Sequence, residues 1–165
     1  MLREVRARFI ARPTGFAWVE TGRLACSGYP GSRRQLAWAS HHGIDAVLTL
    51  TEAPLREECR SGLPMTFEHV PMKDHASPDA ATLDRGVETL RRLLRERRAV
   101  LVHCLAGEGR TGCVLAGYMV KDKGMDGANS LAAIRRVKRK FVERGQEAAV
   151  YQYASWVGSH QGAQG

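Results

Sequence analysis

A cysteine and an arginine, Cys104 and Arg110, are separated by five residues in the stretch VHCLAGEGRTG at residues 102–112. The apolar run before Cys104 predicts a buried strand, and the run after Arg110 predicts a helix. Strand, tight loop and helix would place the cysteine at the mouth of the loop and the arginine in the first helical turn. The sulfur of Cys104 is therefore a candidate nucleophile.

The loop between them predicts an anion site. A glycine-rich turn that enters a helix lines up backbone N–H groups and adds the positive end of the helix dipole. Gly107 and Gly109 allow the backbone conformations that such a cradle needs. Arg110 adds a planar, two-pronged donor that suits phosphate oxygens.

The same positive field acts on the sulfur. A cysteine at a helix N-terminus and near cations ionises with a pKa far below the free value of about 8.5. A thiolate held against a phosphate makes phosphoryl transfer to sulfur the natural reaction. The Lys-Ser/Thr ending of a nucleotide-binding loop is absent, and no second, acidic magnesium site is apparent, so the stretch is not a nucleotide P-loop. The alternative, a buried cysteine beside a glycine turn, does not explain the spacing of His103, Cys104, Arg110 and Thr111.

Length and composition bound the class of protein. The 165 residues, 44% hydrophobic and 25% charged, suit one domain over residues 1–165, with about 1–12 and 158–165 as flexible ends. No apolar run approaches the ~18 residues of a membrane span, so we expect no integral membrane segment. Separately, we expect a monomer. The start lacks the apolar core of a secretory signal, although its arginines leave a transit peptide as an alternative. The four cysteines have no C-x-x-C spacing, which favours a reducing, cytoplasmic compartment.

The formal net charge of +8 predicts attraction to anions. Phosphate groups, nucleic acid, acidic lipid and acidic proteins all fit. The alternative is a surface whose charge only keeps the protein in solution.

Strands alternate with helices along the chain. Strands are expected at 16–20, 23–28, 44–51, 66–72 and 100–103, and helices at 33–43, 77–98, 110–124, 128–140 and 147–157. This order predicts an α/β fold with a central, mostly parallel sheet flanked by helices. Ligands of such sheets bind at the carboxyl ends of the strands, which is where Cys104 lies.

The stretch VHCLAGEGRTG resembles the signature loop of the cysteine-based protein tyrosine phosphatases, which is His-Cys, five residues, Arg, and Ser or Thr. The segments FAWVETGRLACSGYP, VLTLTE, VPMKDHASPD and GQEAAVYQY are similar to counterparts in the small atypical dual-specificity phosphatases. The resemblance implies a protein-tyrosine-phosphatase-like fold, no metal and no cofactor, and a phosphoprotein or phosphopeptide as substrate.

The resemblance also implies a role for each residue of the loop. Cys104 matches the nucleophile that forms a phosphocysteine, and Thr111 matches the hydroxyl residue that hydrogen-bonds the thiolate and helps its departure. His103 matches the residue that orients the loop, although a satisfied core histidine is an equally ordinary reading. The phosphate cradle would consist of Leu105, Ala106, Gly107, Glu108, Gly109 and Arg110.

A general acid must come from a separate loop, since the leaving oxygen needs a proton. Asp74, just past a strand, resembles the acid of the family. Its rivals Asp79 and Asp84 are expected inside the helix that Ser77 starts. Gln146 resembles the glutamine that positions the hydrolytic water, or else is an exposed polar residue at a helix start.

The loop composition bears on the substrate. Lysines that often mark phosphatases of polyphosphorylated lipids are missing at Leu105 and Glu108, and the acid at Glu108 would repel extra phosphates. No tyrosine-lined loop is evident upstream that would build a deep slot for phosphotyrosine. A shallower pocket is expected to admit phosphoserine and phosphothreonine as well as phosphotyrosine. The leading hypothesis is a dual-specificity protein phosphatase that also hydrolyses aryl phosphates. The alternatives are a phosphatase of RNA 5′ ends or phospholipid, and a phospho-binding pseudoenzyme, against which the complete residue set argues.

Oxidation of the thiolate raises one further hypothesis. Cys59, in the polar stretch REECRSG, could lie near Cys104 as a resolving thiol, with Cys26 as the second candidate, or Cys59 could be an incidental exposed cysteine. Cys113 is expected to face the core.

Overall fold

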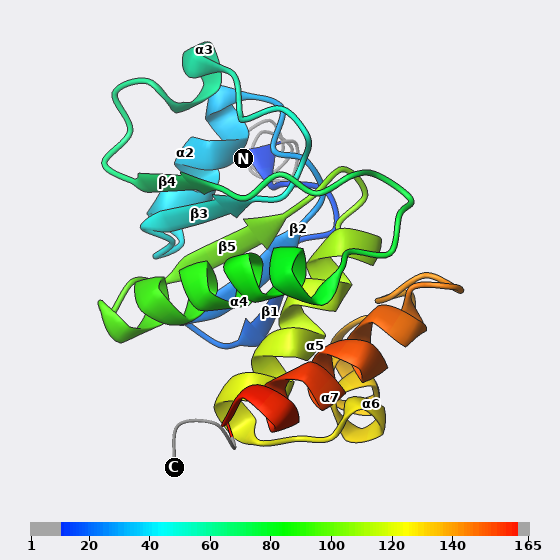
Figure 1. Ribbon diagram of the computed structural model, residues 1–165. Helices are drawn as coiled ribbons and strands as arrows, with labels where there is room; N and C mark the ends of the chain where they lie inside the picture. The colour runs from blue at the N-terminus through cyan, green and yellow to red at the C-terminus, as the bar shows by residue number, and fades with distance from the viewer. Residues whose placement is uncertain (1–10, 162–165) are drawn as a thin grey trace.

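The computed structural model describes residues 11–161, which form a five-stranded sheet in the order β1-β2-β5-β3-β4 (Figure 1). Only β1 and β2 are antiparallel; the other neighbours are parallel. The predicted α/β fold with a mostly parallel sheet is therefore confirmed. The strands are β1 (Ala17–Glu20), β2 (Leu24–Ser27), β3 (Ala46–Thr49), β4 (Thr66–His69) and β5 (Val100–His103).

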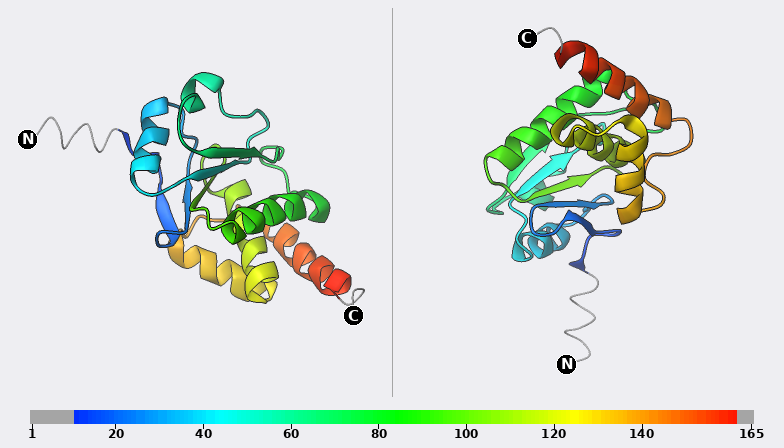
Figure 2. Two further views of the ribbon diagram at one scale, coloured as in Figure 1. Left: turned by 90° about the vertical axis from the view of Figure 1, so that its left-hand side faces the viewer. Right: turned by 90° about the horizontal axis from the view of Figure 1, so that it is seen from below.

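Helices cover both faces of the sheet (Figures 1 and 2). One face carries α2 (Arg33–His41) and α3 (Glu57–Arg60), and on the other side lie α4 (Ala80–Arg95), α5 (Gly109–Lys123), α6 (Gly127–Val137) and α7 (Glu147–Gln161). The short α3 was not expected, because four residues are too few to show helical periodicity. The expected flexibility of the ends concerns mainly residues 1–10 and 162–165, which lie outside the described part; residues 158–161 belong to α7.

Strand alternation divides the core into two layers. Leu24, Cys26 and Val102 point to the α4–α7 side, whereas Ala25 and Leu101 point to the α2 side. The helix that follows the cysteine loop, α5, is buried over almost its whole length, from Gly109 to Val120. The candidate nucleophile therefore precedes the most enclosed helix of the described chain.

The start of α4 differs from the expectation. The helix begins at Ala80, and Asp79 caps it by accepting a hydrogen bond from the Thr82 N–H at 2.7 Å. Ser77, expected as the cap, instead donates its hydroxyl hydrogen to the carbonyl oxygen of Gly145 at 2.9 Å. A carboxylate competes well for an N-cap position, so Ser77 is left to bind a neighbouring loop.

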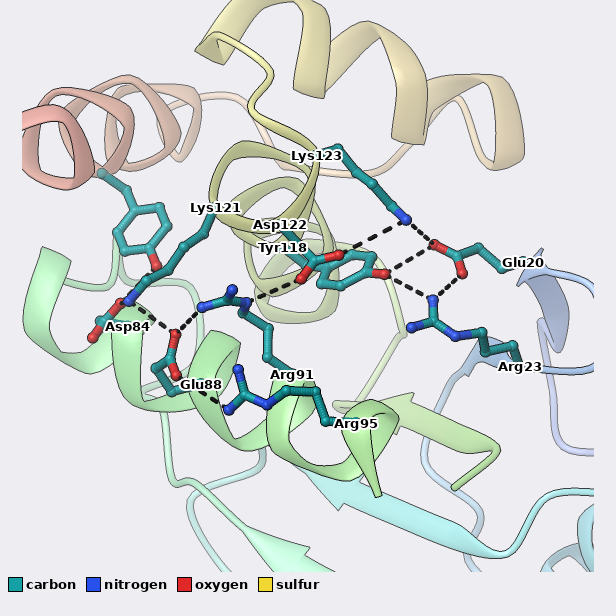
Figure 3. A network of polar contacts seen from close by, with 11 residues as sticks. Glu20, Arg23, Asp84, Glu88, Arg91, Arg95, Tyr118, Lys121, Asp122 and Lys123 are labelled. Carbon is teal, nitrogen blue, oxygen red and sulfur yellow. Dashed lines mark hydrogen bonds and ion pairs between the residues drawn. The ribbon is translucent and has the colours of Figure 1, made fainter. Parts of the chain in front are cut away.

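A polar network ties the helices together around the last part of α5 (Figure 3). Lys121 of α5 pairs with Asp84 and Glu88 of α4, at 2.7 and 2.9 Å. The Tyr153 hydroxyl of α7 donates to Asp84 at 2.7 Å. Three helices thus share one cluster of charges. Among residues 11–161, no helix has the length and hydrophobicity to cross a membrane.

Candidate active site

The cysteine loop begins at the carboxyl end of β5, the central strand. Cys104 is 2% exposed, and the Gly107 N–H donates to its sulfur at 3.3 Å. One N–H group of the loop, that of Gly107, therefore points at the Cys104 sulfur, as expected of a cradle of backbone donors.

Glycine is required at one position of this loop. Gly107 has φ of +76°, and a Cβ there would lie 2.4 Å from the carbonyl oxygen of Ser27. The segment just after β2 also contacts the loop, since the Tyr29 N–H donates to the Leu105 carbonyl oxygen at 2.9 Å. The loop is thus fixed by backbone contacts to the neighbouring strand.

Arg110 lies in the first turn of α5 and is 4% exposed. Its Nη1 donates to the Met72 carbonyl oxygen at 3.1 Å, and its Nη2 pairs with Asp74 Oδ1 at 2.9 Å. The guanidinium therefore links the cysteine loop to the segment that follows β4.

The structure brings Asp74, and neither of its rivals, to Cys104 and Arg110. The Asp74 N–H donates to Glu52 Oε1 at 3.1 Å, so Glu52 holds the backbone of this segment. Asp79 is the N-cap of α4, and its bond from the Thr82 N–H lowers the pKa of that carboxyl. Asp84 is engaged by Lys121 and Tyr153 in the helical network. The expectation that Asp79 lies inside a helix started by Ser77 was wrong, because the N-cap is Asp79 itself, two residues after Ser77.

His103 is fully buried beneath the loop. Its Nδ1 lies 3.1 Å from the Cys104 carbonyl oxygen and its Nε2 lies 2.8 Å from Thr49 Oγ1. A carbonyl oxygen only accepts, so Nδ1 carries the proton and, in the neutral ring, Nε2 accepts from Thr49. Burial lowers the pKa of His103 to about 4. The ring ties the loop to β3 and is also a satisfied core histidine.

Thr111 is buried, and its Oγ1 has no hydrogen-bond partner among the described residues. The expected bond from Thr111 to the Cys104 sulfur is therefore not among the contacts of this structure. A buried hydroxyl without a partner beside the cradle is free to donate a hydrogen bond to a reacting group.

The other cysteines separate by sheet face. Cys113 is buried in the same layer as Cys104, as expected, and burial raises its pKa to about 12. Cys59 is 2% exposed and packs in the α2 layer, on the opposite face from Cys104. The view of Cys59 as an exposed thiol was wrong, and the sheet separates it from Cys104.

Gln146 is 4% exposed, so its description as an exposed residue at a helix start was also wrong. Its Oε1 accepts from the Glu143 N–H and its Nε2 donates to the Ala76 carbonyl oxygen, both at 3.2 Å. Gln146 thus lies between the segment that precedes α7 and the segment that carries Asp74.

A small pocket of about 50 Å³ joins these side chains. Its lining consists of Asp74, His75, Cys104, Leu105, Ala106, Gly109, Arg110, Glu143 and Gln146. His75 and Glu143 were not expected, because no spacing in the sequence relates two residues from such distant segments. The pocket offers cationic and N–H donors beside a sulfur, with a carboxylate opposite, and this arrangement suits a small oxyanion. Within residues 11–161, no three His, Cys, Asp or Glu side chains group as a metal site would require.

Comparison with known proteins agrees with this geometry. The family model described as "PTP-SAK: Swiss Army Knife protein, DSP-PTPase phosphatase domain" matches residues 13–150. A curated relative, the phosphatidylinositol 3,4,5-trisphosphate 3-phosphatase cnrN of Dictyostelium discoideum, is 27% identical over 137 residues. The match covers 73% of this chain and 21% of the relative, so the chain spans about a fifth of that protein's length.

Solved structures share the fold. A mutant form of Tk-PTP is 26% identical, with a TM-score of 0.77 over 86% of this chain and 96% of that one. PTPMT1 has a TM-score of 0.75 at 15% identity, over 90% of this chain and 99% of its own, which shows the fold alone. The fold, the loop and the extent of the family match together place this chain in the Swiss Army Knife family of DSP-PTPase phosphatase domains, which are cysteine-based phosphatases.

Proposed function

We propose that this protein hydrolyses phosphomonoesters without a metal, through a phosphocysteine at Cys104. The single observation that carries the proposal is the pocket in which the Cys104 sulfur, the Arg110 guanidinium and the Asp74 carboxyl meet. The reaction needs three groups: a nucleophile, a donor of hydrogen bonds to the phosphate oxygens, and a proton donor.

In the first step, the Cys104 thiolate attacks phosphorus and the bond from phosphorus to the leaving oxygen breaks. Asp74, in its protonated form, gives its proton to that oxygen, while Arg110 and the loop N–H groups bind the equatorial oxygens. The products are the free alcohol or phenol and a phosphorylated sulfur.

In the second step, water attacks the phosphorus. Asp74 accepts a proton from this water, the P–S bond breaks, and inorganic phosphate and the thiolate are released. Gln146, which is buried beside the pocket, is the residue proposed to position the water. Thr111, whose hydroxyl has no partner among residues 11–161, is proposed to donate to the departing thiolate.

The proposed substrates are phosphotyrosine and phosphoserine or phosphothreonine in proteins, as in a small dual-specificity phosphatase of the dual specificity protein phosphatase 23 type. Two features support a protein substrate. Leu105 is 60% exposed at the pocket, where it offers an apolar contact to a side chain or ring. Glu143 lines the pocket, and Glu108 precedes the first residue of α5 in the same loop as Cys104; two acids in these segments disfavour a headgroup with several phosphates.

A second candidate is a phosphoinositide phosphatase. It is favoured by the similarity to cnrN, which is named as a phosphatidylinositol 3,4,5-trisphosphate 3-phosphatase. The net charge of +8 is compatible with an acidic lipid, and equally with RNA 5′ ends.

The test is turnover of para-nitrophenyl phosphate in the presence of a chelator, with acid quenching and mass spectrometry of the Cys104 peptide. We expect turnover and a phosphate adduct on Cys104; full dependence on added metal, or no adduct under steady turnover, would contradict the mechanism. A panel of phosphopeptides, inositides and triphosphate-ended RNA then separates the substrate classes.

A further inference from the structure

Two loops from distant parts of the chain face each other across the pocket. One loop, residues 73–79, carries Asp74 and leads into α4; the other, residues 141–146, leads into α7. The Ser77 hydroxyl donates to the Gly145 carbonyl oxygen at 2.9 Å, and Gln146 Nε2 donates to the Ala76 carbonyl oxygen at 3.2 Å. These bonds fix the second half of the 73–79 loop and leave Asp74 itself to other contacts.

The contact next to Asp74 is made by His75. Its Nε2 lies 3.6 Å from Asp74 Oδ2, and its Nδ1 lies 3.4 Å from Glu143 Oε2. The imidazole thus stands between a carboxylate of its own loop and a carboxylate of the facing loop. Arg110 pairs with the other carboxylate oxygen of Asp74, Oδ1, so His75 is the contact that joins Asp74 to Glu143.

The backbone on both sides of this contact is unusual. His75 has φ of +52° and Val142, the neighbour of Glu143, has φ of +62°. A left-handed conformation is costly for a residue with a side chain, and especially for a β-branched valine. Such residues persist where the surrounding contacts hold them, and here two of them flank one interaction.

We infer that His75 and Glu143 form a latch that positions the loop of Asp74 for proton transfer. The inference rests on the proposed function, in which Asp74 is the general acid. His75 is a positioning residue: it reaches Glu143 across the pocket, and it acts on the leaving group only through Asp74. The latch is exposed, with the His75 side chain 78% accessible, so its removal should loosen the loop and leave the fold intact.

The test uses two substrates that differ in leaving group. Phenyl phosphate needs a proton on its leaving oxygen, whereas para-nitrophenyl phosphate needs little help. We expect His75→Ala to lower kcat for phenyl phosphate about threefold to fivefold, the effect of losing one exposed side-chain hydrogen bond, with KM nearly unchanged. The loss for para-nitrophenyl phosphate should be smaller. Glu143→Gln should give the same pattern, and the double variant should lose no more than either single one.

A background without the acid separates positioning from a structural role. In Asp74→Asn, the further change His75→Ala should have no effect on kcat, because the group that it positions is gone. The control is His41→Ala, an exposed histidine of α2 outside the pocket, which should leave both rates unchanged.

Three results would overturn the inference. Equal losses of kcat with the two substrates, or a loss that persists in the Asp74→Asn background, would show a general structural role. If Asp74→Asn lowers kcat for phenyl phosphate as expected but His75→Ala has no effect, the latch would be disproved and the general acid of the proposed function would stand. An Asp74→Asn variant with unchanged kcat for phenyl phosphate would remove the acid of the proposed function, and with it the purpose of the latch.

Discussion

The Cys104 side of the pocket and the Asp74 side are held by different kinds of contact. On the Cys104 side, His103 and Thr111 are fully buried, and the loop is fixed by backbone contacts to β2. On the Asp74 side, the side chains of Asp74 and Glu143 are 36% and 40% exposed, and side-chain contacts hold the loop. Arg110 touches both sides.

The difference suits the two tasks. The groups that stabilise charge in a transition state work best when they are fixed before the substrate arrives. A proton donor must adapt to leaving groups of different size, and loops with few buried contacts open at low cost in free energy. The comparison therefore predicts large, substrate-independent effects on the Cys104 side and substrate-dependent effects on the Asp74 side.

The largest effect should come from Cys104→Ser. Loss of the nucleophile should reduce turnover of every substrate by about 10⁴–10⁶-fold, as for other enzymes whose nucleophile acts within a unit. Binding of inorganic phosphate, measured by calorimetry, should remain, because the cradle consists of N–H groups and Arg110. Retained turnover would contradict the covalent mechanism.

Asp74→Asn should act on the opposite side of the pocket. We expect kcat for phenyl phosphate to fall about 10²–10⁴-fold, the usual contribution of general acid catalysis, with a clearly smaller loss for para-nitrophenyl phosphate. Steady-state rates with a series of aryl phosphates give the measurement. An equal loss along the series would assign Asp74 a structural role, and Asp79→Asn would then be the next variant to measure.

Arg110→Lys tests the residue that the two sides share. Lysine keeps the charge and loses the planar fork, so the bonds to the Met72 carbonyl oxygen and to Asp74 cannot both be kept. We expect kcat to fall on the order of 10²–10³-fold, as for loss of a major oxyanion donor. A normal kcat with only a raised KM would show that a point charge is sufficient.

His103 should make stability depend on pH. Its pKa is about 4 in the fold against an ordinary value of 6.5, so between these values the unfolded chain binds more protons. The free energy of unfolding should therefore fall as the pH drops from 6.5 to 4, by up to about 3 kcal/mol from this group. Urea unfolding of wild type and His103→Gln at several pH values gives the difference.

If His103→Gln does not fold, the ring can be titrated by NMR in the intact protein. A ring that titrates near pH 6.5 would show that burial does not hold it neutral. Either measurement tests whether the rigid side of the pocket depends on a neutral imidazole.

The smallest effect is expected in the helical network of Figure 3, none of whose labelled residues lines the pocket. Tyr153→Phe removes the bond to Asp84, whose carboxylate keeps its ion pair with Lys121. We expect a loss of about 1–2 kcal/mol in unfolding free energy and no change in kcat. Tyr151→Phe, in the same helix at a site 47% exposed, is the control and should change neither. A fall in kcat for Tyr153→Phe would show that the network reaches the pocket.

The sequence was informative where function depends on neighbours in the chain. Cys104, Gly107 and Arg110 belong to one strand–loop–helix unit, so their spacing alone predicts their arrangement, and the α/β order predicts the sheet edge where they lie. The beginning of α4 was missed, because two capping residues, Ser77 and Asp79, compete within three positions and tertiary contacts decide between them.

Contacts between distant segments could not be predicted. His75 meets Glu143, and Gln146 meets Ala76, only after α4 to α6 have packed. The burial of Cys59 has the same origin: its local sequence is polar, but its sulfur lies 3.6 Å from the Gly31 carbonyl oxygen in the α2 layer. Local polarity says little about a residue that a neighbouring element covers.

The position of β5 has a consequence for how the protein is made. It is the last strand in the sequence and the middle one in the sheet, between β2 and β3. A nascent chain that stops before residue 100 contains two separate strand pairs, each with an inner edge that can join another chain. Insertion of Val100–His103 closes both inner edges, and Cys104 follows at once. Translation therefore sets the order of events: the inner edges stay unpaired until Val100–His103 is made, and the proposed nucleophile follows directly after the strand that closes them.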